Sequence, residues 1–239
     1  MERARFSRRG TVPVGVLLSP MTSRLRALRQ WQYLYLLVAL VVMLVAYPYA
    51  GSGGGLGVAA VLIPIASVFA LSTGHQRYLV VPAVLGAVTL FGIFEDAAGL
   101  EIVPGLAVEV SALLLFAYTT VFVLQSVLRR DRVTGDTLCG AIAVYLMMGL
   151  TWSFAHVLLQ HLRPGSYRVV AGGMRMANSK ELLYFSYVTL ATLGYGDVIP
   201  VTDGARSLAV LEALGGTVYM AILVARLIGL SLAHSGTPR

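Results

Sequence analysis

The sequence predicts an all-α membrane protein with six transmembrane helices and one shorter helix that enters the membrane without crossing it. Three observations support this fold class. Apolar residues make up 57% of the 239 residues and charged residues 12%, and the mean hydropathy is +0.79, far from the averages of soluble domains. Apolar stretches recur along the chain with basic residues between them. A glycine-rich segment, 192–197, separates the last two apolar stretches.

The apolar stretches predict the helices in order. A bilayer core about 30 Å thick needs roughly 20 apolar residues in a helix that crosses it. Five stretches meet or approach that length, and a sixth begins near residue 205. The six cover residues 32–50, 56–72, 78–94, 106–128, 138–159 and 205–232. They leave little room for a soluble domain, so we expect any regulatory domain to belong to another protein.

The arginines predict how these spans are oriented. Seven arginines precede the first span and three lie in the loop 129–136, whereas the loop 51–55 is uncharged and the loop 95–105 is acidic. Because basic loops stay in the cytoplasm, both termini are expected there. The loop 160–180 departs from the rule, since it is expected outside although it is basic. Orientation accounts for the net charge of +7, so no nucleic-acid partner is expected.

Residues 1–30 predict a basic cytoplasmic leader, within which Met21 is an alternative start. A basic stretch followed by an apolar run also fits a secretory signal peptide, with Ala50 near the cleavage point. The apolar run is longer than a typical signal core, and cleavage would leave five spans. We therefore favour a first transmembrane helix.

Three features that suggest other chemistry fit structural roles better. The glycines of GSGGGLG, 51–57, lack the preceding strand of a dinucleotide site and the Lys-Ser/Thr pair of a phosphate loop. His156 and His161 are five residues apart and point to different helix faces, so no metal site is expected. The single Cys139 excludes an internal disulfide. No catalytic constellation lies in the spans, so neither an enzyme nor a cofactor is expected.

Residues 180–192 predict a helix too short to cross a bilayer. Since it enters from the outside, its carboxyl end points to the membrane centre, where the negative end of its dipole stabilises a cation. Non-helical backbone at that depth is tolerated where it lines a polar path. Gly194 and Gly196 permit the backbone angles that align successive carbonyl oxygens.

The residues that follow this half-helix, TLGYGD at 192–197, resemble the selectivity filter of potassium channels, TVGYG. The one filter difference is Leu193 in place of valine, and its side chain is expected to point away from the ion. The half-helix before the filter and the apolar helix after it extend the resemblance over about 134–231. The chain thus resembles the potassium channel pore-domain family, in its bacterial six-helix form.

The resemblance implies that filter oxygen atoms replace the water around K⁺, which is the permeant ion. One filter strand cannot surround an ion, so one filter per chain implies a homotetramer. Asp197 is expected to concentrate cations at the outer mouth. The ion-binding residues are Thr192, through its hydroxyl and carbonyl, and Leu193, Gly194, Tyr195 and Gly196.

The last span holds the residues expected to gate and line the pore. The simplest bacterial channels have a hinge glycine 20 residues beyond the last filter glycine, which places it at Gly216. Thr217, Met220 and Val224 share one face at i, i+3, i+7 spacing, where they either line the cavity or pack against other helices.

Two residues depart from the simplest channels. Val188 stands where some bacterial channels carry a glutamate that pairs with the filter aspartate, so filter inactivation is expected to differ. Glu212 is an ionisable residue inside the last span and would cost about 2.5–3.5 kcal/mol if it faced lipid. It either braces the pore helix or senses protons, or it makes a neutral hydrogen bond to a hydroxyl such as that of Thr189.

These observations divide the chain into the leader at 1–30, a four-helix domain at 31–133 and a pore domain at 134–239. The four-helix domain resembles a voltage sensor without gating arginines, because Glu109 is the only ionisable residue in 106–128. We expect a potassium-selective channel without strong voltage gating. A non-conducting sensor or scaffold that keeps a pore fold is the alternative.

The expected location is a cell membrane, on composition the inner membrane of a bacterium, where lipids surround the chain. The partner or stimulus that regulates it is not predicted.

Overall fold

The computed structural model describes residues 31–49, 61–66, 77–100, 102–130, 134–170 and 173–235. The leader with Met21, the residue Ala50, the loop 51–55 and most of the expected span 56–72 lie outside the described residues. Within the described part, 61–66 are helical, as expected for that span.

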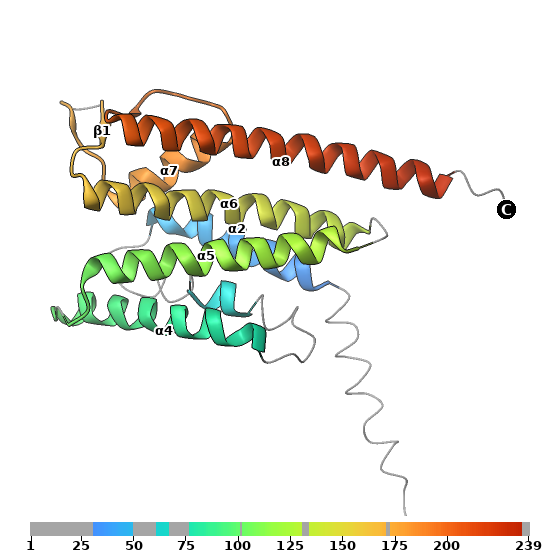
Figure 1. Ribbon diagram of the computed structural model, residues 1–239, viewed down its shortest axis with the longest axis horizontal. Coiled ribbons are helices and arrows are strands. Elements are labelled where there is room, and N and C mark those ends of the chain that lie inside the picture. Colours follow the sequence, from blue (N-terminus) through green and yellow to red (C-terminus); the bar gives the residue numbers. More distant parts are fainter. Residues whose placement is uncertain are drawn as a thin grey trace, which may run out of the picture.

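Long helices lie side by side along one axis of the molecule (Figure 1). Helix α5 packs against α4 and α6, and α6 also contacts α2, α7 and α8. The short helix α7 lies at one end, beside α6 and α8 (Figure 1). The bounds are α2 (Gln32–Ala46), continued by the 3₁₀ turn η1 (Tyr47–Tyr49), α4 (Arg77–Ala98), α5 (Gly105–Leu128), α6 (Gly135–Leu162), α7 (Ser179–Leu190) and α8 (Asp203–Ser235).

Three of the described helices are long and apolar enough to cross a membrane. They are α5, α6 and the part of α8 from Asp203 to Arg226. The segments Gln32–Ala46 and Leu79–Glu95 are shorter apolar helices. Of the six predicted spans, length and composition therefore support three among the described residues.

Helix α7 ends two residues earlier than the predicted 192. Its last residue is Leu190, and at Thr192 the backbone angle φ is +57°, which no α-helix contains. At 12 residues, α7 is about 18 Å long, roughly half the thickness of a bilayer core, as expected for a half-helix.

A small antiparallel sheet, which the sequence did not predict, lies at the same end of the molecule as α7. Its strands are β1 (Tyr167–Val169), β2 (Arg175–Met176) and β3 (Val198–Pro200), in the order β2-β1-β3. Val169 pairs with Val198, and Tyr167 pairs with Pro200. The sheet therefore ties the chain that leaves 192–197 to the loop that follows α6.

Buried apolar side chains form two clusters that hold these elements together. The first lies between α2, α5 and α6 and reaches α7, and the second lies under the sheet and the outer part of α7. Gly140 on α6 permits close packing in the first, because a Cβ atom there would come within 2.9 Å of the Tyr33 ring. The second contains Tyr167, Val169, Ala177, Leu182, Phe185, Val198 and Ala205.

Polar contacts to backbone join the helices at the end opposite the sheet. Asp136, near the start of α6, accepts hydrogen bonds from two backbone N–H groups in the first turn of α2. Arg226 on α8 donates to the carbonyl oxygens of Val127 at 3.3 Å, Leu128, and Arg130 at 3.0 Å. A cation is favourable where a helix leaves carbonyl groups unpaired, so Arg226 fastens α8 to the end of α5.

Candidate functional site

The backbone that follows α7 has left-handed angles at every second residue. The φ angles are +57° at Thr192, +58° at Gly194 and +76° at Gly196. In an ordinary strand neighbouring carbonyl groups point to opposite sides, whereas an alternation of left-handed and right-handed residues is expected to turn successive carbonyl oxygens to the same side. Glycine adopts such angles freely, but threonine rarely does. A threonine held there is typical of a functional site that stores strain.

The carbonyl oxygens of this segment have no protein partner among the described residues. The N–H groups of its first two residues donate back to the last turn of α7, at 2.9 and 2.8 Å. No described donor bonds to the carbonyl oxygens that follow, so they are free to bind water or a cation. These oxygens belong to Thr192, Leu193, Gly194 and Tyr195.

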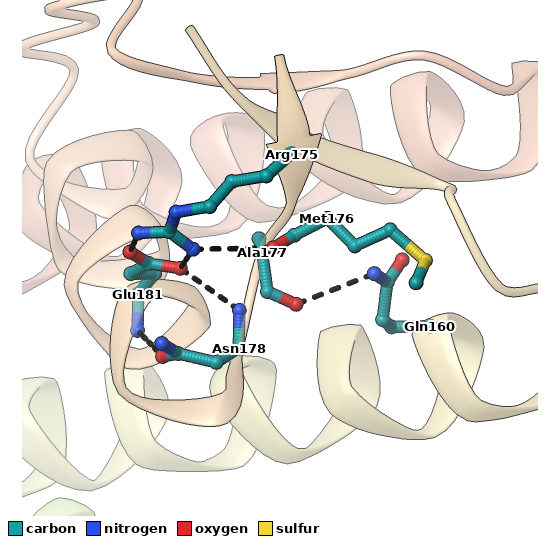
Figure 2. Close-up of polar contacts among 6 residues, drawn as sticks. All are labelled: Gln160, Arg175, Met176, Ala177, Asn178 and Glu181. Atoms are coloured by element: carbon teal, nitrogen blue, oxygen red, sulfur yellow. Dashed lines mark hydrogen bonds and ion pairs between the residues drawn. The ribbon is translucent and has the colours of Figure 1, made fainter. Parts of the chain in front are cut away.

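The amino end of α7 is fixed by a capping box and an ion pair (Figure 2). Asn178 Oδ1 accepts from the Glu181 N–H at 3.0 Å, and Glu181 Oε2 accepts from the Asn178 N–H at 2.9 Å. Arg175 donates to both carboxylate oxygens of Glu181. Gln160 of α6 donates to the Ala177 carbonyl at 3.3 Å. The start of α7 is therefore attached to both β2 and α6.

Replacement of Asn178 by alanine should lower the free energy of unfolding by about 1 kcal/mol, because one N–H group at the start of α7 loses its acceptor. Thermal unfolding in detergent would measure the change. Asn178→Asp keeps a side-chain oxygen at the same position and is the matched control. Equal stability of Asn178→Ala and the unmodified protein would show that the cap does not fix α7.

The same ion pair predicts a stability that depends on pH. The hydrogen bond from Arg175 lowers the pKa of Glu181 from its ordinary value of 4.5. Because the folded state favours the ionised form, the stabilisation is complete above pH 4.5 and is lost as the pH falls below it, through the lowered pKa. Glu181→Gln keeps the capping hydrogen bond but carries no charge. Its melting temperature should lie below that of the unmodified protein at neutral pH and approach it in acid; a constant difference would contradict this origin.

The carboxyl end of α7 is held by contacts from α6 and α8. The Tyr145 hydroxyl donates to the Leu190 carbonyl at 3.1 Å, and Tyr187 donates to a backbone carbonyl of α6 at 2.7 Å. Two glycines let the helices approach. A Cβ atom at Gly149 would lie 2.4 Å from the Tyr187 ring, and one at Gly216 would lie 2.6 Å from the Leu190 carbonyl oxygen. The last turn of α7 therefore has little freedom to move.

Glu212 of α8 is fully buried beside the middle of α7. Its Oε1 lies 2.5 Å from the Ser186 hydroxyl, and its Oε2 lies 2.7 Å from His156 Nε2. The other ring nitrogen of His156 lies 2.7 Å from the Tyr167 hydroxyl. From the sequence, Thr189 was named as an example of a hydroxyl that could bond Glu212, and in the structure the hydroxyl that faces Glu212 belongs to Ser186, one turn earlier. His156 was considered from the sequence only as a metal ligand and was missed as the partner of Glu212, although a second ionisable residue inside a predicted span was a signal.

The two histidines of α6 have separate partners. His161 Nδ1 lies 3.2 Å from Glu109 Oε1 on α5, near the surface, whereas His156 is buried. Within the described residues, no group of three or more histidine, cysteine, aspartate or glutamate side chains could hold a metal ion. Cys139 is a free, half-buried thiol.

The outer side of the segment is attached to the sheet. The Asp197 carbonyl accepts from the Val170 N–H at 2.9 Å, which extends the pairing of β1 with β3. The Asp197 carboxylate accepts from the Val198 N–H at 3.1 Å and interacts with Tyr184 of α7. In one chain, Leu193 and Tyr195 are 56% and 66% exposed, so neither residue is buried in the core of the described residues.

Helix α8 is the least buried of the membrane-length helices. Thr217, Met220 and Val224 are exposed in one chain, whereas Gly216 is buried against α7. Helix α8 therefore has one face on α7 and other faces that the described residues do not cover.

Comparisons of the sequence with known proteins found a matching family and several similar proteins. A family described as an ion channel matches residues 137–230. Protein LctB of Geobacillus stearothermophilus is 35% identical over 121 residues, which are 49% of this chain and 88% of LctB. The voltage-gated potassium channel Kch of Escherichia coli is 27% identical over 47% of this chain and 25% of its own length. Two pore potassium channel c of Oryza sativa subsp. japonica is 32% identical over 36% of this chain and 17% of its own length. No solved structure matches the chain.

Proposed function

Because this chain belongs to the potassium channel pore-domain family, we propose that it conducts K⁺ passively and selectively across a membrane through a pore formed by four copies. The family is one of ion channels and not of enzymes. Selectivity, conduction and the number of copies are our proposal.

The alternating backbone at 192–196 is the observation that carries it. Carbonyl oxygens that are turned to one side and have no partner among the described residues would form a set of ligands suited to a monovalent cation stripped of water. Thr192, Leu193, Gly194, Tyr195 and Gly196 would supply these ligands, with the Thr192 hydroxyl at the inner end. Since α7 ends directly before the first of them, its dipole adds a negative potential at that end.

We propose a homotetramer because one chain alone cannot surround an ion. One filter strand covers only one side of an ion, and the described residues contain one such strand. The exposed Leu193 and Tyr195 side chains and the uncovered apolar faces of α8 would then pack against neighbouring copies.

The remaining site residues take roles from the same arrangement. Asp197 would concentrate cations at the outer mouth, and Thr217, Met220 and Val224 would line the cavity. Gly216 is proposed as a hinge, and its close contact with Leu190 means that bending there would also act on α7.

We propose six spans in all, with both termini on the cytoplasmic side of a bacterial inner membrane and with 31–133 as a four-helix domain before the pore domain 134–239. Between Gly105 and Leu128, α5 contains no lysine or arginine, so strong voltage gating is not expected. Arg226 would instead transmit movement between α5 and the inner end of α8.

The proposal is tested by ion uptake into liposomes that contain the purified full chain. Rubidium, the heavier analogue of potassium, should enter liposomes loaded with K⁺ far faster than sodium does, in exchange for the K⁺ that leaves. Protein-free liposomes are the control. Equal uptake of rubidium and sodium would contradict selectivity, and no uptake of either would favour a scaffold that keeps the pore fold.

A further inference from the structure

A buried series of four polar contacts joins β1, α6, α8 and α7. From the sheet inward it runs from the Tyr167 hydroxyl to His156, then to Glu212, then to Ser186, and ends at the Gly149 carbonyl of α6. The side chains of these four polar residues are buried. Water therefore does not supply missing donors or acceptors, and the groups must satisfy one another.

Each contact is short enough to require a proton between its two atoms. The distances are 2.7 Å between Tyr167 Oη and His156 Nδ1, 2.7 Å between His156 Nε2 and Glu212 Oε2, and 2.5 Å between Glu212 Oε1 and Ser186 Oγ. Ser186 Oγ lies 2.7 Å from the Gly149 carbonyl oxygen. Two acceptors without a proton between them repel each other at such distances, so four contacts need four protons.

If Glu212 is ionised, the four contacts have one proton fewer than they need. The tyrosine hydroxyl, a neutral imidazole and the serine hydroxyl carry one suitable proton each, which makes three. The Ser186 hydroxyl has one proton and can donate it either to Glu212 Oε1 or to the Gly149 carbonyl, but not to both. One of these two short contacts is left without a hydrogen bond.

Placing the fourth proton on His156 does not give every contact a hydrogen bond. An imidazolium donates from both nitrogens, to Tyr167 and to Glu212, but Ser186 still has one proton for two acceptors. It also places a full positive and a full negative charge in a dry interior, which is costly. Among the described residues, the other titratable side chains that interact with Glu212 are phenols, which carry no compensating charge in neutral form: Tyr145, Tyr167 and Tyr187.

A protonated Glu212 satisfies every contact at once. Tyr167 donates to His156 Nδ1, His156 Nε2–H donates to Glu212 Oε2, Glu212 Oε1–H donates to Ser186, and Ser186 donates to Gly149. We infer that Glu212 is a protonated positioning residue, which fixes Ser186 and thereby the height and rotation of α7 from which 192–196 begins. The consequence for ion selectivity rests on the proposed function, whereas the protonation itself does not.

Glutamine is the decisive replacement, because it reproduces the protonated carboxyl group. Its oxygen can accept from His156, and its NH₂ group can donate to Ser186. Glu212→Gln should therefore keep the ratio of rubidium to sodium uptake within about twofold of the unmodified protein. Ser186→Ala, which removes both hydrogen bonds of the hydroxyl, should lower that ratio by at least about fivefold, the effect of losing even one hydrogen bond of typical strength. The histidine–carboxylate pair near the surface gives the matched control, Glu109→Gln, which should leave the ratio unchanged.

Infrared spectroscopy of the protein in lipid at neutral pH measures the protonation state of Glu212 directly and does not depend on ion flux. The difference spectrum between the unmodified protein and Glu212→Gln should contain the C=O stretching band of a protonated carboxyl group. A carboxylate band in its place, or a loss of selectivity in Glu212→Gln as large as that in Ser186→Ala, would overturn the inference. If the protonated band is present while no variant carries rubidium, the proton site stands and the proposed conduction fails.

Discussion

Alanine at Gly194 is expected to abolish potassium flux while the chain still folds. At φ = +58° an L-residue with a Cβ atom is strained by about 1–2 kcal/mol, whereas glycine is not. In a tetramer the strain occurs in all four copies and sums to about 4–8 kcal/mol. Since 1.4 kcal/mol is a factor of ten, the population of the aligned backbone should fall by at least about a thousandfold. Rubidium uptake into liposomes should fall with it.

The fold should survive because the added methyl group makes no close contact in the described part of its own chain. Apart from the neighbouring residues, no described atom lies within 4 Å of a Cβ built at Gly194. Gel filtration and thermal unfolding should therefore give values close to those of the unmodified protein. Gly204→Ala is the control, because Gly204 lies in the first turn of α8 and its Cβ would make only an ordinary contact at 4.0 Å. Uptake by Gly194→Ala at the level of this control would contradict the role given to the alternating backbone.

Alanine at Gly216 is expected to damage both stability and selectivity, because it forces α7 and α8 apart. The added Cβ would lie 2.6 Å from the Leu190 carbonyl oxygen, a backbone atom that cannot rotate away. Overpacking of this kind costs typically about 1–3 kcal/mol in each chain. Any shift of Leu190 moves Thr192, two residues later, and disturbs the first ion ligands.

The neighbouring glycine separates this effect from the general effect of a methyl group in α8. A Cβ at Gly215 would lie 3.9 Å from Trp152, an ordinary contact. Alanine favours a helix over glycine by about 1 kcal/mol, so Gly215→Ala should be as stable as the unmodified protein or more stable. Thermal unfolding and rubidium-to-sodium uptake ratios of the two variants test this. If Gly216→Ala behaves like Gly215→Ala, the close contact with α7 has no role in holding the site.

Local sequence was sufficient to predict the long helices α5, α6 and α8 and the left-handed glycines after α7. Those features depend on residues close together in the chain: apolar runs for α5, α6 and α8, and two glycines two residues apart for the alternating backbone. Where a predicted helix end differs from the structure, the reason also lies in nearby residues. Helix α6 begins at Gly135, three residues before the predicted start, because Thr134 caps it and accepts from the Thr137 N–H.

The contacts that hold α7 in place could not be predicted in the same way. Strands of two and three residues carry no periodic pattern. Strand β1 forms because β2 and β3 lie on either side of it. The partner of Glu212 depends on the rotation of α7 about its axis, which decides between Thr189 and Ser186. His156 is 56 residues from Glu212, so only the packing of α6 on α8 brings them together.

The central claim is that backbone oxygens of 192–195 from several copies coordinate a monovalent cation on a common axis. A structure of the assembled protein in lipid, with rubidium in place of potassium and its anomalous scattering recorded, tests this directly. The account predicts a row of rubidium peaks on a fourfold axis, between the carbonyl oxygens of Thr192 to Tyr195. An assembly in which this segment lies away from the axis, or in which the axis holds no rubidium beside it, would contradict the account.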